Sequence, residues 1–144
     1  MGRIKQSQIT YWCHEIIRSQ AEAGGCYIDA TMGKGNDTLF LCELAGENGK
    51  VLAFDIQQEA LDATRELLRI HGKEQQAELI LDGHEHMGRY AMEESTDVIC
   101  FNFGYLPGGD HKLATTYQTS IEAIGKGLGI LKHGGMMSLC IYSG

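Results

Sequence analysis

Short apolar runs alternate with helical patterns along the whole of this 144-residue sequence. The apolar runs lie at 26–30, 50–54, 78–81, 97–101 and 136–142. Apolar residues at helical spacing occupy 9–21, 36–45, 58–71, 84–92 and 114–131. Strands that alternate with helices of this length are typical of βαβ units, and strands that are apolar on both faces are typical of a covered parallel sheet. The sequence therefore predicts an α/β fold with a mainly parallel sheet, in a single domain spanning residues 1–144.

The first and last helical patterns carry more detailed expectations. Ser7 is a plausible N-cap of the first helix, and Gly24–Gly25 ends it. Trp12 lies at helical spacing and is expected in the core rather than on a base-stacking surface. The last helix contains three glycines, each of which costs up to about 1 kcal/mol relative to alanine. Close packing against a neighbour is one explanation for Gly125, Gly127 and Gly129.

Composition narrows the class of protein. The net charge of −7 lacks the electrostatic signature of a strong nucleic-acid binder, although a local basic patch stays possible. No stretch has the length of a membrane span, and the first residues lack the apolar core of a signal peptide. Five cysteines without a CxxC pair indicate reduced thiols and no zinc knuckle. We therefore expect a cytoplasmic protein with no membrane partner.

The turn after the first apolar run has the character of a ligand-binding loop. Asp29 ends that run, and Gly33 and Gly35 would let the backbone approach a ligand without an intervening Cβ atom. Asn36 and Asp37 are expected to cap and start the next helix and to contribute to the ligand site. A glycine-rich turn of this kind is weak evidence by itself, because tight strand-to-helix turns also use glycine for steric reasons.

The next apolar run strengthens the case for a nucleoside. Asp55 ends "KVLAFDIQ" about twenty residues beyond the glycines, where a carboxylate that bridges ribose hydroxyls is expected. The spacing is not GxGxxG, so a pyrophosphate cradle is disfavoured. An acidic residue such as Asp29 suits instead the ammonium or sulfonium charge of S-adenosylmethionine.

The third and fourth runs end in further polar residues. Asp82, Gly83 and His84 fall where a loop would meet an adenine ring, and Asn102 falls beside the transferred methyl group. This constellation resembles a class I methyltransferase with a Rossmann-like fold. In "HEH" at 84–86, solvated side chains are favoured over a metal site, so no metal is expected. Cys100 lies within a strand and is expected to point into the core, which argues against a cysteine nucleophile.

Four motifs in order, D-A-T-x-G-x-G-N-D, F-D-I-Q, D-G-H and N-x-G-Y-L-P-G-G-D-H, closely resemble the YtqB-like (MnmM) family. The resemblance covers essentially the whole chain. It implies methylation of 5-aminomethyl-2-thiouridine in the anticodon region of tRNA, with S-adenosylmethionine as methyl donor. The cofactor contacts that it implies are Lys34, Asn36, Asp55, Gln57 and His84. Lys34 departs from the family, which commonly has asparagine between the two glycines.

Motif position also suggests catalytic roles in a reaction where a neutral amine attacks the methyl carbon. Asn102 is the candidate for holding the amine, Tyr105 for bordering the uridine, and Asp110 for accepting a proton. Asp110 and His111 resemble a catalytic dyad, and a simple polar turn is an equally good interpretation.

The sequence ends at "SLCIYSG", whereas class I methyltransferases usually continue through a helix and a two-stranded hairpin. A truncated domain is therefore expected, with 136–142 as an uncharged edge strand open to a homodimer or to aggregation. Two other functions stay open: a methyltransferase acting on rRNA or a small molecule, and a non-catalytic module that binds S-adenosylmethionine.

Overall fold

The computed structural model describes residues 6–103 and 112–141. Its five strands form one sheet in the order β3-β2-β1-β4-β5, and every neighbouring pair is parallel. The strands are β1 (Cys26–Asp29), β2 (Lys50–Asp55), β3 (Ala77–Leu81), β4 (Thr96–Phe103) and β5 (Leu131–Ile141). This confirms the parallel α/β fold predicted from the alternating pattern.

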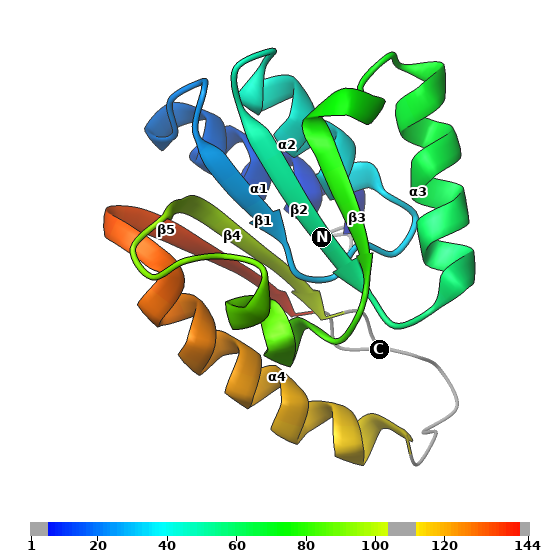
Figure 1. Cartoon of the computed structure of the whole chain (residues 1–144), viewed down its shortest axis with the longest axis vertical. Helices are drawn as coiled ribbons and strands as arrows, with labels where there is room; N and C mark the ends of the chain where they lie inside the picture. The colour runs from blue at the N-terminus through cyan, green and yellow to red at the C-terminus, as the bar shows by residue number, and fades with distance from the viewer. Residues whose placement is uncertain (1–5, 104–111, 142–144) are drawn as a thin grey trace, which may run out of the picture.

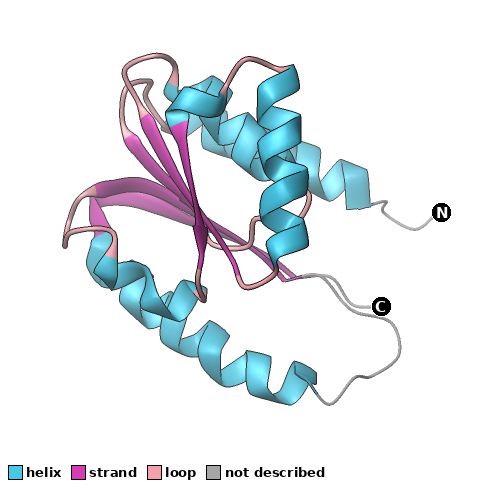
Figure 2. Cartoon of the chain, turned by 45° about the vertical axis from the view of Figure 1, so that its right-hand side comes forward, coloured by secondary structure: helices cyan, strands magenta, loops and turns pink. Residues whose placement is uncertain are grey.

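Helices cover both faces of the sheet, which gives three layers (Figures 1 and 2). The first three, α1 (Gln6–Gln20), α2 (Asn36–Ala45) and α3 (Gln58–Ile70), lie on one face. The other face carries the 3₁₀ helix η2 (His84–Arg89) and α4 (Lys112–Ile130), and a short 3₁₀ turn, η1 (Glu74–Gln76), precedes β3. None of the described helices is both long and apolar enough to cross a lipid bilayer.

The apolar strands supply two cores, one on each side of the sheet. Tyr27 and Val98 pack with Leu41 on the side of α1 to α3, whereas Ile28 and Ile99 belong to the cluster on the side of η2 and α4. Successive strand residues point to opposite faces, so a strand covered on both sides must be apolar at every position. This is why the runs showed no alternation of apolar and polar residues.

Two expectations for α1 are wrong. Ser7 lies inside the helix rather than before it, and Trp12 is 51% exposed. Cys13 and Ile17, one turn apart, lie on the inner side of α1, and each residue of a helix is rotated by about 100° from the one before. Trp12 and Ile16 therefore point away from the sheet, although their spacing is as helical as that of the inner pair.

The glycines of α4 do not share one explanation. A Cβ atom on Gly127 would lie 2.8 Å from Met137 Cε and 3.3 Å from Ile99 Cδ1, so this glycine lets α4 approach the sheet. A Cβ atom on Gly125 or Gly129 would meet no atom within 4 Å. Close packing thus accounts for Gly127 only.

Two elements differ in type or length from their prediction. The pattern at 84–92 forms the 3₁₀ helix η2, because hydrogen bonds to Asp82 hold this segment close to the end of β3. β5 starts at Leu131, five positions before the predicted 136, and its pairing with β4 is irregular between Thr96 and Val98.

Candidate functional site

The polar residues singled out in the first four strands meet at the carboxyl edge of the sheet. Asp29 is in register with Ala53 and Cys100. Backbone contacts join the loops that follow these strands: the N–H of Met32 donates to the carbonyl of Phe54 (2.9 Å), and that of Asn102 donates to Thr31 Oγ1 (2.7 Å). The ends of β1, β2, β3 and β4 therefore form one continuous edge, where open α/β sheets bind ligands.

Asp55 ties the glycine loop to the start of α3. Its Oδ2 accepts a hydrogen bond from the N–H of Gly33, and its Oδ1 accepts one from the N–H of Gln57, both at 3.0 Å. Each carboxylate oxygen has capacity for a second donor, so ribose hydroxyls fit the remaining positions. Ile56, immediately after it, is 74% exposed and offers an apolar surface beside the carboxylate. Sequence reasoning missed Ile56, although an apolar residue directly after a strand-end carboxylate was a visible signal.

The two glycines of the loop have different roles. Both have positive φ, 54° at Gly33 and 91° at Gly35. A Cβ atom on Gly33 would have only Thr31 O, at 4.0 Å, as a neighbour, so the backbone here is open to a ligand. A Cβ atom on Gly35 would lie 2.8 to 3.0 Å from atoms of Thr64 in α3. The expectation that Gly35 serves ligand approach is therefore corrected: it allows α3 to pack against the loop.

Asp29 stabilises the glycine loop from the protein interior. Its side chain is fully buried and accepts hydrogen bonds from Thr38 Oγ1 (2.6 Å) and from the N–H of Thr31 (3.1 Å). Burial, and then the negative charge of Asp37, raise the pKa of Asp29 to about 7. The predicted contact with a sulfonium would require this carboxylate to be exposed at the edge. It is instead enclosed by its own loop.

The start of α2 also differs from its prediction. Gly35 is the N-cap, Asn36 is the first helical residue, and no side chain caps the helix. Lys34, Asn36 and Gln57 are exposed around the loop. These three side chains are therefore available to a ligand, and the capping role given to Asn36 is wrong.

The loop after β3 is organised by Asp82. Its carboxylate accepts hydrogen bonds from His86 Nδ1 (2.7 Å), Tyr90 Oη (2.8 Å) and the N–H of Gly83 (2.8 Å). The bonds from His86 and Tyr90 lower the pKa of Asp82 to about 2. The carboxylate of Asp82 faces its own loop. The backbone N–H of Asp82 donates to the carbonyl of Asp55 (3.0 Å), which links the loop to β2.

His84 is a half-buried part of the same edge. Its Nδ1 donates to the carbonyl of Ala30 at 3.0 Å, and its ring lies near Phe101 and Phe103, with centroids 5.6 and 6.4 Å away. Burial lowers the pKa of His84. The interpretation of "HEH" as solvated side chains is wrong for His84, whereas the side chain of His86 is 37% exposed while it bonds Asp82.

A further pair, His14 and Asp37, was missed by sequence reasoning. His14 of α1 lies with its Nε2 2.7 Å from Asp37 Oδ1, and its ring stacks on Phe40 with centroids 3.8 Å apart and planes 4° apart. The pair borders a small cavity of about 10 Å³ that also touches Asn102. Nothing in the local pattern of α1 distinguished His14 from a surface histidine.

Two cysteines meet beside this pair. Cys13 Sγ of α1 lies 2.8 Å from Cys140 Sγ of β5, and both side chains are half-buried. Cys100 is buried in β4, and burial raises its pKa, so the expectation that it belongs to the core is confirmed. Tyr105, Asp110 and His111 lie outside the described residues.

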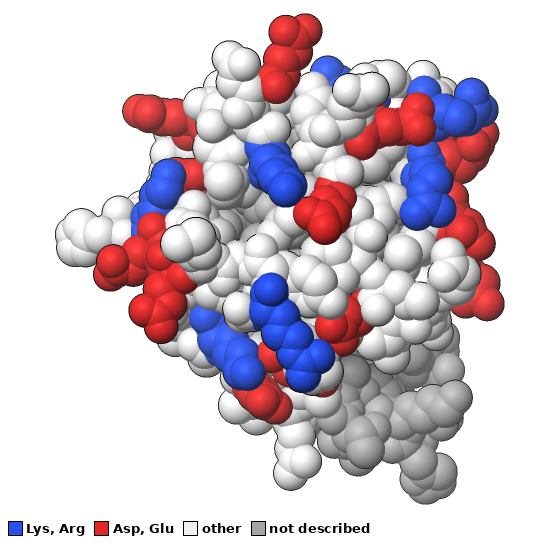
Figure 3. Space-filling model, viewed as in Figure 1, with Lys and Arg blue, Asp and Glu red and all other residues white. Residues whose placement is uncertain are grey.

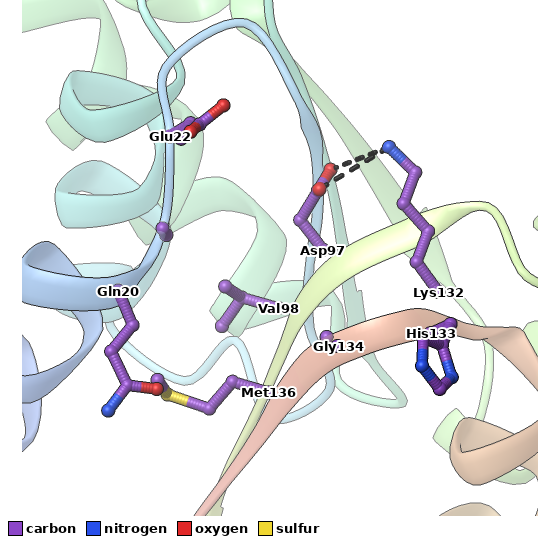
Figure 4. A pocket seen from close by; sticks show the side chains of 10 residues that line it. Gln20, Glu22, Asp97, Val98, Lys132, His133, Gly134 and Met136 are labelled. Atoms are coloured by element: carbon purple, nitrogen blue, oxygen red, sulfur yellow. Dashed lines mark hydrogen bonds and ion pairs between the residues drawn. The ribbon is translucent and has the colours of Figure 1, made fainter.

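A separate hollow of about 210 Å³ lies at the amino ends of β4 and β5 (Figure 4). Two of its charged groups bind each other: Lys132 Nζ lies 3.3 Å from both oxygens of Asp97, and Asp97 Oδ2 also accepts a hydrogen bond from the N–H of Cys26 (2.9 Å). The hydrogen bond between Cys26 and Asp97 joins the start of β1 to β4 at this end of the sheet. The carboxyl edge is therefore the stronger candidate site.

The carboxyl edge fits a nucleoside. Gly33 presents open backbone, Asp55 presents a carboxylate at a strand end, and Ile56 presents an apolar surface for a flat ring. These are the features that the strand-end site of a Rossmann-like fold needs for a ribose and a base.

Comparison with known proteins identifies the family of this chain. A family model described as "Putative rRNA methylase" matches residues 51–144. A relative named chloroplastic tRNA (mnm(5)s(2)U34)-methyltransferase, from Arabidopsis thaliana, is 34% identical over 99% of this chain and 54% of its own length. The chain thus spans about half the length of this curated relative.

Two solved structures share the fold. The structure titled "putative rRNA-methylase" from Clostridium thermocellum is 39% identical, with a TM-score of 0.86 over 99% of this chain and 75% of that one. SMU.1697c from Streptococcus mutans, titled a putative methyltransferase in complex with SAH, is 38% identical, with a TM-score of 0.80 over 97% of this chain and 74% of that one. The Rossmann-like class I methyltransferase fold is therefore confirmed, and the chain belongs to the family described as "Putative rRNA methylase".

Proposed function

We propose that this chain carries an S-adenosylmethionine-dependent N-methyltransferase activity that converts 5-aminomethyl-2-thiouridine at the tRNA wobble position to the 5-methylaminomethyl form. The observation that carries this proposal is the similarity of nearly the whole chain to the chloroplastic tRNA methyltransferase. The complex of the Streptococcus mutans relative with SAH supports the choice of cofactor.

The carboxyl edge gives each part of the cofactor a partner. Asp55 binds the ribose hydroxyls, the backbone of Gly33 lies against the nucleoside, and Ile56 packs against the adenine. The loop at Asp82, Gly83 and His84 borders the other side of the ring, and the hydrogen bonds of Asp82 and His84 hold it in place. When bound, the cofactor supplies a methyl group made electrophilic by the sulfonium.

The glycine loop adds polar groups around the rest of the cofactor. Lys34, Asn36 and Gln57 are exposed and able to contact it, with Lys34 pairing with its carboxylate. Gly35 and Asp29 act by holding the loop in shape. These assignments keep the residues chosen from the sequence except Asp37, and they give Gly35 and Asp29 a role in the shape of the loop.

The reacting amine lies near Asn102 at the end of β4, whose backbone is fixed by Thr31. Asn102 holds the amine, Tyr105 borders the uridine, and Asp110 is the candidate for the proton acceptor that follows from the sequence. The work of these residues is to position the amine and to exclude water around it.

The substrate is the anticodon region of tRNA, bound by shape and a few stacked bases rather than by a broad basic surface. Acidic and basic side chains are interspersed on the face shown in Figure 3. The exposed Trp12 and Tyr11 of α1 are available for stacking. A homodimer through the edge of β5 and a cytoplasmic location belong to the same proposal.

A second candidate substrate is rRNA, favoured by the description of the matched family. Incubating the protein with S-adenosylmethionine and either undermodified tRNA or ribosomal RNA, followed by mass spectrometry of the nucleosides, separates the two. We expect the mass of 5-aminomethyl-2-thiouridine to increase by about 14 Da, because methylation adds one CH₂ unit. Methylation of rRNA alone would contradict the proposal in favour of the second candidate.

A further inference from the structure

We propose that His14 accepts the proton of the substrate amine and that Asp37 orients its imidazole ring; this inference rests on the function proposed above. The pair joins α1 to the N-terminal turn of α2, at the edge of the sheet that carries the candidate site. Residues from α1, β4 and β5 line the small cavity beside it: Thr10, Cys13, Asn102, Ser138 and Cys140. His14 and Asn102, the residue to which the proposed function assigns the amine, therefore line the same small cavity.

The imidazole is held in one orientation. Its Nε2 lies 2.7 Å from Asp37 Oδ1, and its face stacks on the buried ring of Phe40. The guanidinium of Arg18 lies 5.2 Å from the centroid of Phe40. Because the carboxylate accepts the hydrogen bond, Nε2 carries the hydrogen and Nδ1 is the nitrogen that can accept a proton.

Asp37 faces the imidazole ring of His14 directly. The charge of Asp37 also acts on the buried Asp29. The titratable and charged groups around the ring come from five elements: Cys13, Glu15 and Arg18 of α1, Asp29 of β1, Asp37 of α2, Cys100 of β4 and Cys140 of β5.

The chemistry balances in two steps. An alkyl ammonium must first lose a proton, which passes from the substrate nitrogen to Nδ1 of His14. The nitrogen lone pair then forms the new N–C bond with the methyl carbon as the C–S bond breaks, and sulfur keeps the electron pair. The methylated amine carries the positive charge that the sulfonium has lost, and His14 returns its proton to water, so each turnover releases one proton.

The pH dependence of the variants tests this role. His14→Ala and His14→Gln should each lower kcat at pH 7 by about 100-fold or more, the usual contribution of a general base. Imidazole added to His14→Ala should restore part of the rate. The defect should shrink as the pH rises toward about 10, because roughly a third of free amines with pKa values near that of lysine are then unprotonated without help, far more than at pH 7. A defect that is equal at every pH, with no rescue, would overturn the inference.

Two further measurements separate this role from a structural one. Calorimetry should give the same dissociation constant for S-adenosylmethionine with His14→Gln as with the native chain, and His133→Gln, an exposed histidine at the other end of the sheet, should keep full activity. In the protein without cofactor, ¹⁵N-histidine NMR should report the Nε2–H tautomer for His14, and Asp37→Asn should abolish that preference. An unchanged tautomer in Asp37→Asn would remove the orienting role.

The outcomes also distinguish this inference from the proposed function. If the native chain methylates no 5-aminomethyl-2-thiouridine, the proposed function fails, while NMR still tests the pairing of His14 with Asp37. If the native chain is active and His14→Gln keeps more than about a tenth of its kcat, the proposed function stands and the role of His14 is wrong.

Discussion

At the scale of single residues, Asp55 combines a structural and a ligand-binding role. Its two oxygens hold the backbone of Gly33 and Gln57, so the loop is set before any ligand arrives. We expect Asp55→Ala to weaken binding of S-adenosylmethionine by more than tenfold, about 1.4 kcal/mol or more, because charged hydrogen bonds to the ribose are lost. Calorimetry checks this, with the exposed Asp62→Ala of α3 as the matched control. An unchanged dissociation constant would exclude a nucleoside at this strand end.

Asp29 gives the fold a pH dependence of a defined sign. Its pKa is raised from 3.8 to about 7 on folding, so the folded state holds a proton that the unfolded state has lost. The contribution to stability is full below about pH 4 and decreases as the pH rises to about 7, by up to about 1.4 kcal/mol per pH unit. Urea denaturation of the native chain and Asp29→Asn at several pH values should therefore show a smaller decrease in the variant. Parallel curves for the two proteins would contradict this.

The elements show which parts of the molecule were predictable from the sequence. Fully apolar runs and helical spacing are local properties, so the strands, most helices and the strand-end position of Asp55 followed from them. The contact of Gly35 with Thr64 and that of His14 with Asp37 depend on how two separate helices lie against the loop. The outward orientation of Trp12 depends on which side of α1 meets the sheet. A single sequence carries no local signal for contacts between separate elements, or for the side of a helix that meets the sheet.

The glycines of α4 allow a test within one helix. Gly125→Ala and Gly129→Ala should each raise the free energy of unfolding by about 0.5–1 kcal/mol, because alanine favours the helix and the new Cβ atom meets nothing within 4 Å. Gly127→Ala should not share this gain, because its Cβ atom would press on Met137 and Ile99. Urea denaturation of the three variants compares them directly. Equal stabilisation at all three positions would show that α4 does not pack as closely as described.

At the scale of the whole molecule, the sheet has one outer strand with an apolar surface. Among the described residues β5 pairs only with β4, and Leu139 and Ile141 on one of its faces are 46% and 73% exposed. We expect the 144-residue chain to form dimers as its concentration rises, since the uncharged part of β5, residues 136–141, can pair with a second copy. Sedimentation velocity should show Ile141→Lys shifted toward monomer, and Ile70→Lys on α3 unchanged. A native chain that stays monomeric at high concentration would contradict the proposed edge.

The amino ends of the strands offer an attachment point that lies away from the proposed binding site at their carboxyl ends. Cys26 is the exposed cysteine of the five, all of which lie in the described part of the chain, and it begins β1 at the amino edge beside Asp97. The nucleoside and the RNA are assigned to the opposite edge. A maleimide tether on Cys26 would therefore attach the molecule to a sensor surface with its binding edge facing the solution.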